Sequence, residues 1–258
     1  MKKVISKDGT SIAFDQSGDG PPVILMVGGP ADRSMNAELA ELLAPRFTVF
    51  NYDRRGRGDS GDTLPYAVDR EFEDLAAILA EAGGSGALIG YSGTANMALE
   101  AAARKLPIRK LALWEPPFIV DNSRPKVPKD WGQRVDELVS AGRPGDALEY
   151  WMTTIIGIPV EVVAAMRGTA FWSAMEPNAH MLVRDAALLG DFSLPTERLT
   201  SVTVPTLVLD GGEMPWLSRG VRALAEVLPN AQHRTLAGQP HNIPMTVLVP
   251  AIADFLAS

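Results

Sequence analysis

The sequence predicts an α/β protein in which a mostly parallel, twisted sheet is flanked by helices. Continuous apolar runs, such as residues 23–27, are expected of strands that are buried on both faces of a sheet. These runs alternate with segments whose apolar residues have helical spacing, and that alternation is typical of a right-handed, doubly wound sheet. With 258 residues, the chain is long enough for one large domain.

Residues 1–118 contain the first part of this pattern. Two short apolar segments on either side of Lys7-Asp8-Gly9-Thr10 predict an antiparallel hairpin. Residues 69–82 have the apolar spacing of a helix and are followed by Gly83-Gly84, which is a typical helix end. The predicted strands are 4–6, 11–14, 23–27, 47–52, 87–89 and 111–114, and the predicted helices are 34–43, 69–82 and a segment that begins at 93.

The alternation stops after Pro117, where a stretch of helical patterns without a buried strand begins. We therefore predict a helical cap over residues 119–200, inserted into a core that is formed by residues 1–118 and 201–258. The predicted cap helices are 133–140, 146–153, 160–167 and 180–189, and the core resumes with strands at 204–209 and 232–236 and helices at 218–228 and 247–257.

Methionine and tryptophan residues are frequent in the predicted cap. Their ordinary role is to pack the cap against the core. The alternative is that a few of them line an apolar substrate pocket, and that pocket would contain Trp151, Trp172, Met175 and His180.

Residues 87–99 predict a strand, a sharp turn and a helix in immediate succession. Ser92 lies at the turn, where a strained backbone would lift its hydroxyl clear of the sheet. Gly90 and Gly93 leave room for the chain to reverse. The backbone N–H of Gly93, at the start of the helix, would favour a negative charge that develops beside Ser92.

A serine hydroxyl is a poor nucleophile at neutral pH and needs a base, and the chain has three histidines. His233 lies within a predicted strand, where a structural or solvated role is expected, and His180 lies in the predicted cap. His241 follows the last predicted strand, at the edge of the sheet where such folds bind ligands. We therefore predict that His241 is the base.

Residues 90–94, Gly-Tyr-Ser-Gly-Thr, resemble the nucleophile elbow of the α/β-hydrolase superfamily, which is usually Gly-x-Ser-x-Gly. The chain departs from the usual elbow at Thr94, where glycine or alanine is common. Residues 53–60 resemble the superfamily's Asp-x-Arg-Gly-x-Gly-x-Ser signature, which we interpret as structural support. The resemblance covers nearly the full length and implies an α/β-hydrolase fold with an inserted helical cap.

The segment Gly28-Gly29-Pro30, directly after a predicted buried strand, resembles the oxyanion loop of the same superfamily. Val27 stands where the superfamily usually has histidine. The resemblance implies that the backbone N–H groups of Gly29 and Gly93 form the oxyanion hole, and Pro30 has no N–H to contribute.

The acid of the predicted triad is less clearly marked. In most members of the superfamily it is an aspartate three residues past a glycine, and counting from Gly211 reaches Met214, which cannot play this role. Asp210 and Glu213 are close to that place and stay open as alternatives. Certain haloalkane dehalogenases, and lactonases that resemble zearalenone hydrolase, instead carry a glutamate after the preceding strand. Glu115 occupies that position here, and we favour it as the acid.

The resemblance implies a serine hydrolase that cleaves a carboxylic ester or lactone of a small, largely apolar substrate through an acyl-enzyme. It implies no cofactor and no metal. The alternatives within the same fold are a non-hydrolytic ligand-binding or biosynthetic protein, a cofactor-free perhydrolase and a C–C bond hydrolase.

Composition limits the partners. The formal net charge of -7 is spread along the chain without a basic cluster, which argues against nucleic acid and anionic membranes as partners. The absence of cysteine excludes disulfides, thiolate metal sites and a cysteine nucleophile. No apolar stretch approaches the length of a membrane span and none resembles a signal peptide, so we expect a cytoplasmic protein. A homodimer stays open.

Overall fold

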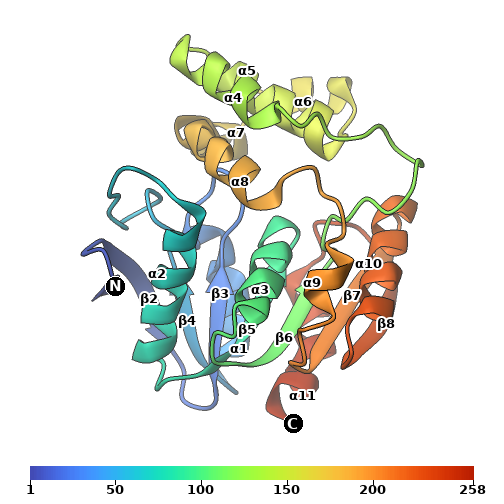
Figure 1. The fold of residues 1–258 in the computed structure, drawn as a ribbon. Helices are drawn as coiled ribbons and strands as arrows, with labels where there is room; N and C mark the ends of the chain where they lie inside the picture. Colours follow the sequence, from blue (N-terminus) through green and yellow to red (C-terminus); the bar gives the residue numbers. More distant parts are fainter.

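The computed structural model describes all 258 residues and has a single eight-stranded sheet (Figure 1). The strand order is β1-β2-β4-β3-β5-β6-β7-β8, in which β1 and β2 run antiparallel to their neighbours and all other pairs are parallel. The predicted mostly parallel sheet is therefore confirmed. The strands are β1 Lys2–Ile5, β2 Ser11–Ser17, β3 Pro22–Met26, β4 Thr48–Tyr52, β5 Gly86–Tyr91, β6 Ile108–Trp114, β7 Thr206–Gly212 and β8 Ala231–Gln239.

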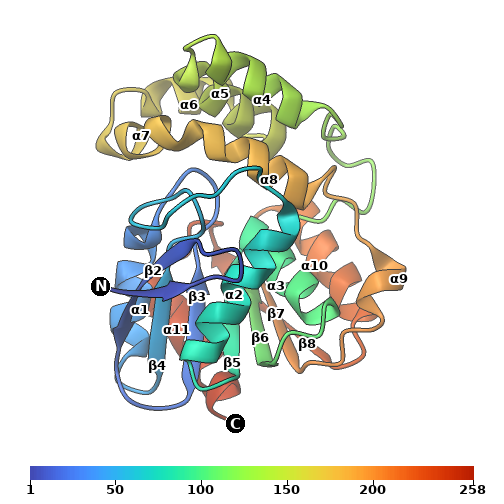
Figure 2. The same cartoon turned by 60° about the vertical axis from the view of Figure 1, so that its left-hand side comes forward.

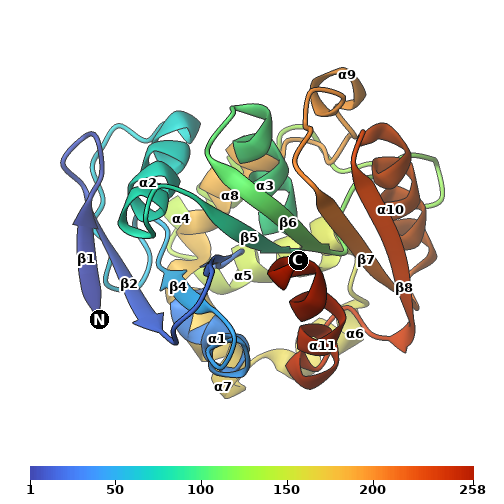
Figure 3. The same ribbon diagram turned by 90° about the horizontal axis from the view of Figure 1, so that it is seen from below.

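Helices cover both faces of this sheet (Figure 3). One face carries α1 (Ala37–Leu43) and α11 (Met245–Ala257), and the other carries α2 (Val68–Glu81), α3 (Gly93–Ala103) and α10 (Pro215–Val227). The predicted helix over 34–43 begins with a 3₁₀ turn, Arg33–Asn36, before it becomes α1. Two hydrophobic clusters result, one on each side of the sheet.

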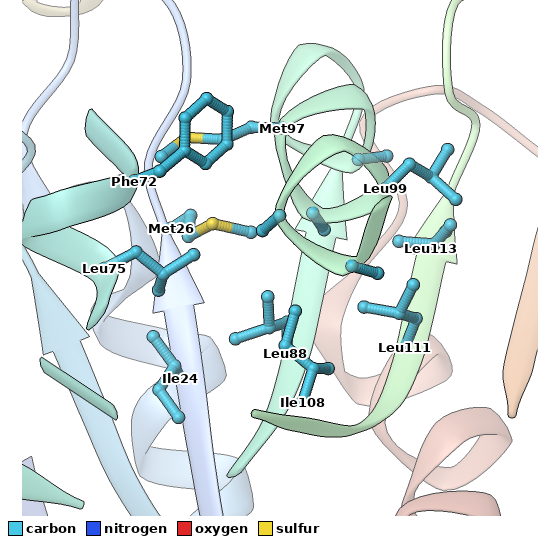
Figure 4. Packing of buried hydrophobic residues seen from close by; sticks show 14 of the residues in the cluster. Ile24, Met26, Phe72, Leu75, Leu88, Met97, Leu99, Ile108, Leu111 and Leu113 are labelled. Atoms are coloured by element: carbon cyan, nitrogen blue, oxygen red, sulfur yellow. The ribbon is translucent and has the colours of Figure 1, made fainter. Parts of the chain in front are cut away.

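Successive residues of a central strand belong to different clusters. In β3, Ile24 packs toward α2 and α3, whereas Leu25 packs toward α1 and α11. Figure 4 shows residues of the first cluster, in which Ile24 and Leu88 of the sheet lie on the same side as Leu75 of α2. Because both faces of the sheet are covered at its centre, each central strand needs apolar residues at consecutive positions. This explains the continuous apolar runs in the sequence.

Between β6 and β7 the chain forms a separate group of helices above the end of the sheet (Figures 1 and 2). Its two ends meet at an isolated parallel bridge between Ile119 and Ser193. The last helix of the segment, α9, instead packs beside α3 and α10 of the core. The helices are α4 Trp131–Ser140, α5 Pro144–Tyr150, a π-helical turn Trp151–Ile156, α6 Val160–Met166, α7 Ala170–Met175, a 3₁₀ turn Glu176–Met181, α8 Leu182–Leu189 and α9 Thr196–Leu199.

Two of these helices, α7 and α9, are not among the predicted ones, and the predicted helix over 146–153 is divided between α5 and the π-helical turn. No helix in the structure combines the length and apolar character that a bilayer crossing requires.

The turn after β4 contains charged side chains that are completely enclosed. Arg54 donates two hydrogen bonds to the carboxylate of Glu71 on α2, at 2.9 and 3.0 Å, and a third to Asp185 on α8, at 2.9 Å. Burial raises the pKa of Glu71, but the charge of Arg54 and its hydrogen bonds outweigh burial, so the net pKa lies below the ordinary value. The turn thus joins the sheet, α2 and α8 through ion pairs that are buried away from solvent.

The adjacent residues of the turn support the backbone in the same way. Asp53 accepts hydrogen bonds from the N–H groups of Arg33, at 2.7 Å, and Asp59, at 2.9 Å. Arg55 pairs with Asp74 of α2 through two hydrogen bonds of 2.7 Å. These contacts agree with the interpretation of residues 53–60 as structural support.

Replacement of Glu71 by glutamine should lower the free energy of unfolding by about 3 kcal/mol, because it removes the main countercharge of a buried arginine. Urea unfolding at neutral pH measures this. The control is Glu137→Gln, which breaks an ion pair with Arg134 in which the glutamate is 51% exposed; its effect should stay below about 1 kcal/mol.

The difference in unfolding free energy between wild type and Glu71→Gln should also depend on pH. Because the folded pKa of Glu71 is lowered, its contribution to stability is present above the ordinary carboxyl pKa of about 4.3 and is lost on acidification. The difference between wild type and Glu71→Gln should therefore shrink as the pH falls below about 4. Equal unfolding free energies of Glu71→Gln and Glu137→Gln at neutral pH would contradict this role.

Candidate active site

Ser92 connects β5 to α3 in a strained backbone conformation, with φ 51° and ψ −126°. Close backbone packing makes a glycine necessary two residues earlier, because a Cβ on Gly90 would lie 2.5 Å from the Cα of Ala95. Gly93 begins α3, and a Cβ there would lie 3.1 Å from a methyl group of Leu189 on α8. The strand, sharp turn and helix predicted around Ser92 are all present.

Thr94, the residue that departs from the usual elbow pattern, closes this turn through its side chain. Its hydroxyl donates to the carbonyl of Tyr91 and accepts from the N–H of Tyr91, both at 2.9 Å. The side chain is buried and its polar atom is fully bonded. Threonine therefore fits the turn without leaving an unpaired polar group.

The loop after β3 brings a second backbone segment to Ser92. Gly29 has φ +61°, and a Cβ there would lie 3.3 Å from the ring of Trp151. Its carbonyl accepts a hydrogen bond of 3.1 Å from Nε of Arg57. A small cavity of about 20 Å³ adjoins both backbone segments, and it is lined by Gly28, Gly29, Arg54, Gly93, Thr94, Asp185, Leu188 and Leu189. The structure thus brings Gly29 and Gly93, the two predicted oxyanion-hole residues, to one place.

His241 and Glu115 form a direct pair. The Nδ1 of His241 lies 2.6 Å from Oε2 of Glu115, and the other carboxylate oxygen accepts a hydrogen bond of 2.9 Å from the N–H of Gly211. Glu115 is fully buried and has φ 43° at the end of β6. The imidazole ring of His241 also lies 5.3 Å from the ring of Tyr91, the residue before Ser92. Of the three candidate acids, Glu115 is therefore the one that the structure brings to His241.

Asp210 has other partners. Its carboxylate lies 2.6 Å from Nε2 of His233 and accepts hydrogen bonds from Ser218, at 2.8 Å, and Thr235, at 3.1 Å. Burial raises the pKa of Asp210, but these three hydrogen bonds together lower it below the ordinary value. Glu213 is exposed to solvent. The structure therefore gives His233 a partner in β7 and leaves both alternative acids away from His241.

The four predicted pocket residues lie in three different environments. Trp151 lies against the Gly29 loop, at the start of the π-helical turn. Trp172 and Met175 are buried in an apolar cluster of α5, α6 and α7. His180 is exposed and its Nδ1 lies 3.1 Å from the carbonyl of Pro177. Packing within the helical segment therefore accounts for Trp172 and Met175, and only Trp151 is seen beside the candidate site.

Arg57 is a residue that sequence reasoning did not connect with this site. Arg57 belongs to the turn that we interpret as structural support. In the structure, its Nε donates a hydrogen bond to the Gly29 carbonyl, and its Nη2 pairs with Asp185 of α8 at 2.9 Å. Burial and the neighbouring charge of Arg54 lower its pKa. No local pattern could reveal this contact, because Gly29, Arg57 and Asp185 belong to three distant segments.

The arrangement can support nucleophilic acyl transfer. A hydroxyl at an elbow, an imidazole fixed by a carboxylate and two adjacent backbone N–H groups are what this chemistry requires. No group of three or more His, Asp or Glu side chains is placed so that it could hold a metal ion. An open groove of about 850 Å³ beside β2 and α1 contains none of the candidate residues.

Comparisons with known proteins agree with the fold. The chain is 50% identical to an alpha/beta hydrolase from Sphaerobacter thermophilus DSM 20745, with a TM-score of 0.94 over 98% of this chain and 99% of that one. A thermophilic esterase from Thermogutta terrifontis, solved with bound malate, is 27% identical, with a TM-score of 0.76 and 99% and 97% coverage.

A curated relative, the non-heme chloroperoxidase CPO-A1 of Kitasatospora aureofaciens, is 26% identical over 93% of this chain and 92% of its own length. The sequence model of the alpha/beta hydrolase family matches residues 23–246. This match spans most of the chain and includes Ser92, Glu115 and His241. The chain therefore belongs to the alpha/beta hydrolase family.

Proposed function

We propose that the protein is a serine hydrolase that cleaves a carboxylic ester or a lactone through an acyl-enzyme on Ser92. The observation that carries this proposal is the 2.6 Å hydrogen bond between His241 and the buried Glu115, beside the strained turn at Ser92. The 27% identity to an esterase supports the same class of reaction.

In the proposed first step, the Nε2 of His241 takes the proton of the Ser92 hydroxyl while Oγ attacks the ester carbonyl carbon. The carbonyl oxygen becomes negatively charged and is stabilised by the N–H groups of Gly29 and Gly93. The C–O bond to the alcohol then breaks, and the imidazolium of His241 gives its proton to the departing oxygen. In a lactone, the released hydroxyl stays attached to the acyl group.

In the second step, His241 removes a proton from water, and the resulting hydroxide attacks the acyl carbon. The bond to Ser92 breaks, its oxygen regains a proton from His241, and a carboxylic acid is released. Throughout the cycle, Glu115 accepts the Nδ1–H of His241, which fixes the tautomer and stabilises the imidazolium.

We propose that the helices between β6 and β7 cover this site as a cap. Trp151, which packs against the Gly29 loop, and Leu188 and Leu189 beside Gly93 favour a small, largely apolar substrate. The relative named as a chloroperoxidase keeps perhydrolysis as a second candidate. In that reaction hydrogen peroxide would replace water in the second step, and the product would be a peracid.

The first prediction concerns Ser92→Ala, which should fold normally and lose hydrolysis of p-nitrophenyl esters by at least about 10⁴-fold, because the acyl-enzyme cannot form. It should also resist labelling by a fluorophosphonate probe. Ser173→Ala, an exposed serine on α7, is the matched control and should keep both properties. Undiminished hydrolysis by Ser92→Ala would overturn the proposal.

The second prediction compares the three carboxylates. Glu115→Gln should reduce kcat by about 10⁴-fold, because a neutral amide no longer fixes the imidazole as a carboxylate does. Asp210→Asn and Glu213→Gln, assayed at equal concentrations of folded protein, should stay within about tenfold of wild type. A nearly normal Glu115→Gln together with an inactive Asp210→Asn would move the acid to the loop after β7.

A further inference from the structure

The backbone carbonyl of His241 accepts two side-chain hydrogen bonds. One comes from the hydroxyl of Tyr91, and the other comes from Nε1 of Trp114 at 2.8 Å. A carbonyl oxygen has two lone pairs, so these two donors use its full capacity. Tyr91 directly precedes Ser92 in the sequence, and Trp114 directly precedes Glu115.

The two donors are held at the same level of the sheet. Tyr91 and Trp114 are register partners in the parallel pair β5 and β6. The N–H of Ser92 donates to the carbonyl of Trp114 at 2.9 Å, and this bond fixes the ends of the two strands relative to each other. The backbone positions of Ser92, Glu115 and both donors therefore belong to one rigid ladder.

The segment that carries His241 has little regular structure of its own. Residues 240–244 lie between β8 and α11, outside any helix or strand, and Pro240 and Pro244 have no N–H. Residues 241–243 take part in no hydrogen bond between main-chain groups. The two bonds to the His241 carbonyl therefore attach this backbone to the ends of β5 and β6.

The chemistry of Tyr91 suits a permanent donor. A tyrosine hydroxyl is ordinarily protonated at neutral pH, and burial and the charge of Glu115 raise the pKa of Tyr91 further. Its ring is tilted by 60° against the imidazole of His241, with 5.3 Å between the ring centres. Tyr91 therefore restrains the histidine both at the main chain and at the side chain.

We propose that Tyr91 and Trp114 are positioning residues that hold the backbone of His241, so that its imidazole reaches Ser92 while it stays bonded to Glu115. This inference rests on the proposed function. The position of a catalytic base on a loop can vary, and a displacement of about 1 Å can lower the rate on the order of 100-fold. The pair Tyr91 and Trp114, which we name the carbonyl clamp, removes this freedom.

The test uses Tyr91→Phe, Trp114→Phe and the double variant in the full chain. Tyr91→Phe keeps the ring and removes only the hydroxyl, so it stays informative if the change at the buried Trp114 destabilises the fold. Tyr150→Phe on α5, whose hydroxyl makes no hydrogen bond to another side chain, is the matched control. Steady-state hydrolysis of a p-nitrophenyl ester gives kcat and KM separately.

We expect kcat to fall about tenfold in each single variant and about 100-fold in the double variant, with KM within about twofold of wild type. The downfield proton resonance of the bond between His241 Nδ1 and Glu115 should shift or broaden in the clamp variants. Tyr150→Phe should change neither quantity.

Folded clamp variants with normal kcat and an unchanged resonance would overturn the inference, while loss of activity in Ser92→Ala would still support the proposed function. A rise in KM alone would also overturn it, because it would indicate contact with the substrate. If Ser92→Ala retains activity, the proposed function fails. In that case the proton resonance of the bond between His241 and Glu115 still tests whether the clamp positions His241, because this resonance does not depend on turnover.

Discussion

The hydrogen bond between His241 and the buried carboxylate of Glu115 is the interaction on which the arrangement of the site depends. A fully buried carboxylate is costly unless each oxygen has a partner, and here the partners are His241 and the N–H of Gly211. Gly211 can be this donor only as glycine, because a Cβ there would lie 1.8 Å from the carbonyl of Gln239. This close approach of β7 and β8 also places the segment that carries His241.

The segment between β6 and β7 is connected to the site by charge as well as by apolar contact. Asp185 of α8 accepts hydrogen bonds from Arg54 and Arg57, and Arg57 in turn holds the carbonyl of Gly29. Because all three charged groups are buried, the contact depends on buried ion pairs rather than on a surface attraction that water screens. The position of α8 and the shape of the Gly29 loop are therefore coupled.

Local sequence patterns predict the sheet, Ser92 and His241 because apolar runs, glycines around a single serine and a histidine after the last strand are local signals. For the acid, the sequence offers three candidates, of which the resemblance favours Glu115. Local patterns cannot complete the choice, because it depends on how β6 and β7 are aligned. Trp151 and Trp172 are equivalent in the sequence, because both are tryptophans in the predicted cap. Only the packing in the structure distinguishes them: Trp151 lies at the Gly29 loop, whereas Trp172 lies in a buried cluster. The pairing of Asp210 with His233 likewise depends on strand register.

Mass-spectrometric mapping of the acyl-enzyme is the most direct measurement of the central claim. The protein is mixed with a p-nitrophenyl ester, quenched in acid during turnover and digested. We expect a single acyl group on the peptide that contains Ser92, because Ser92 lies at the strained elbow and is the nucleophile of the proposed mechanism, with His241 as its base. An acyl group on another residue, or release of p-nitrophenol with no acylated peptide at any time, would contradict it.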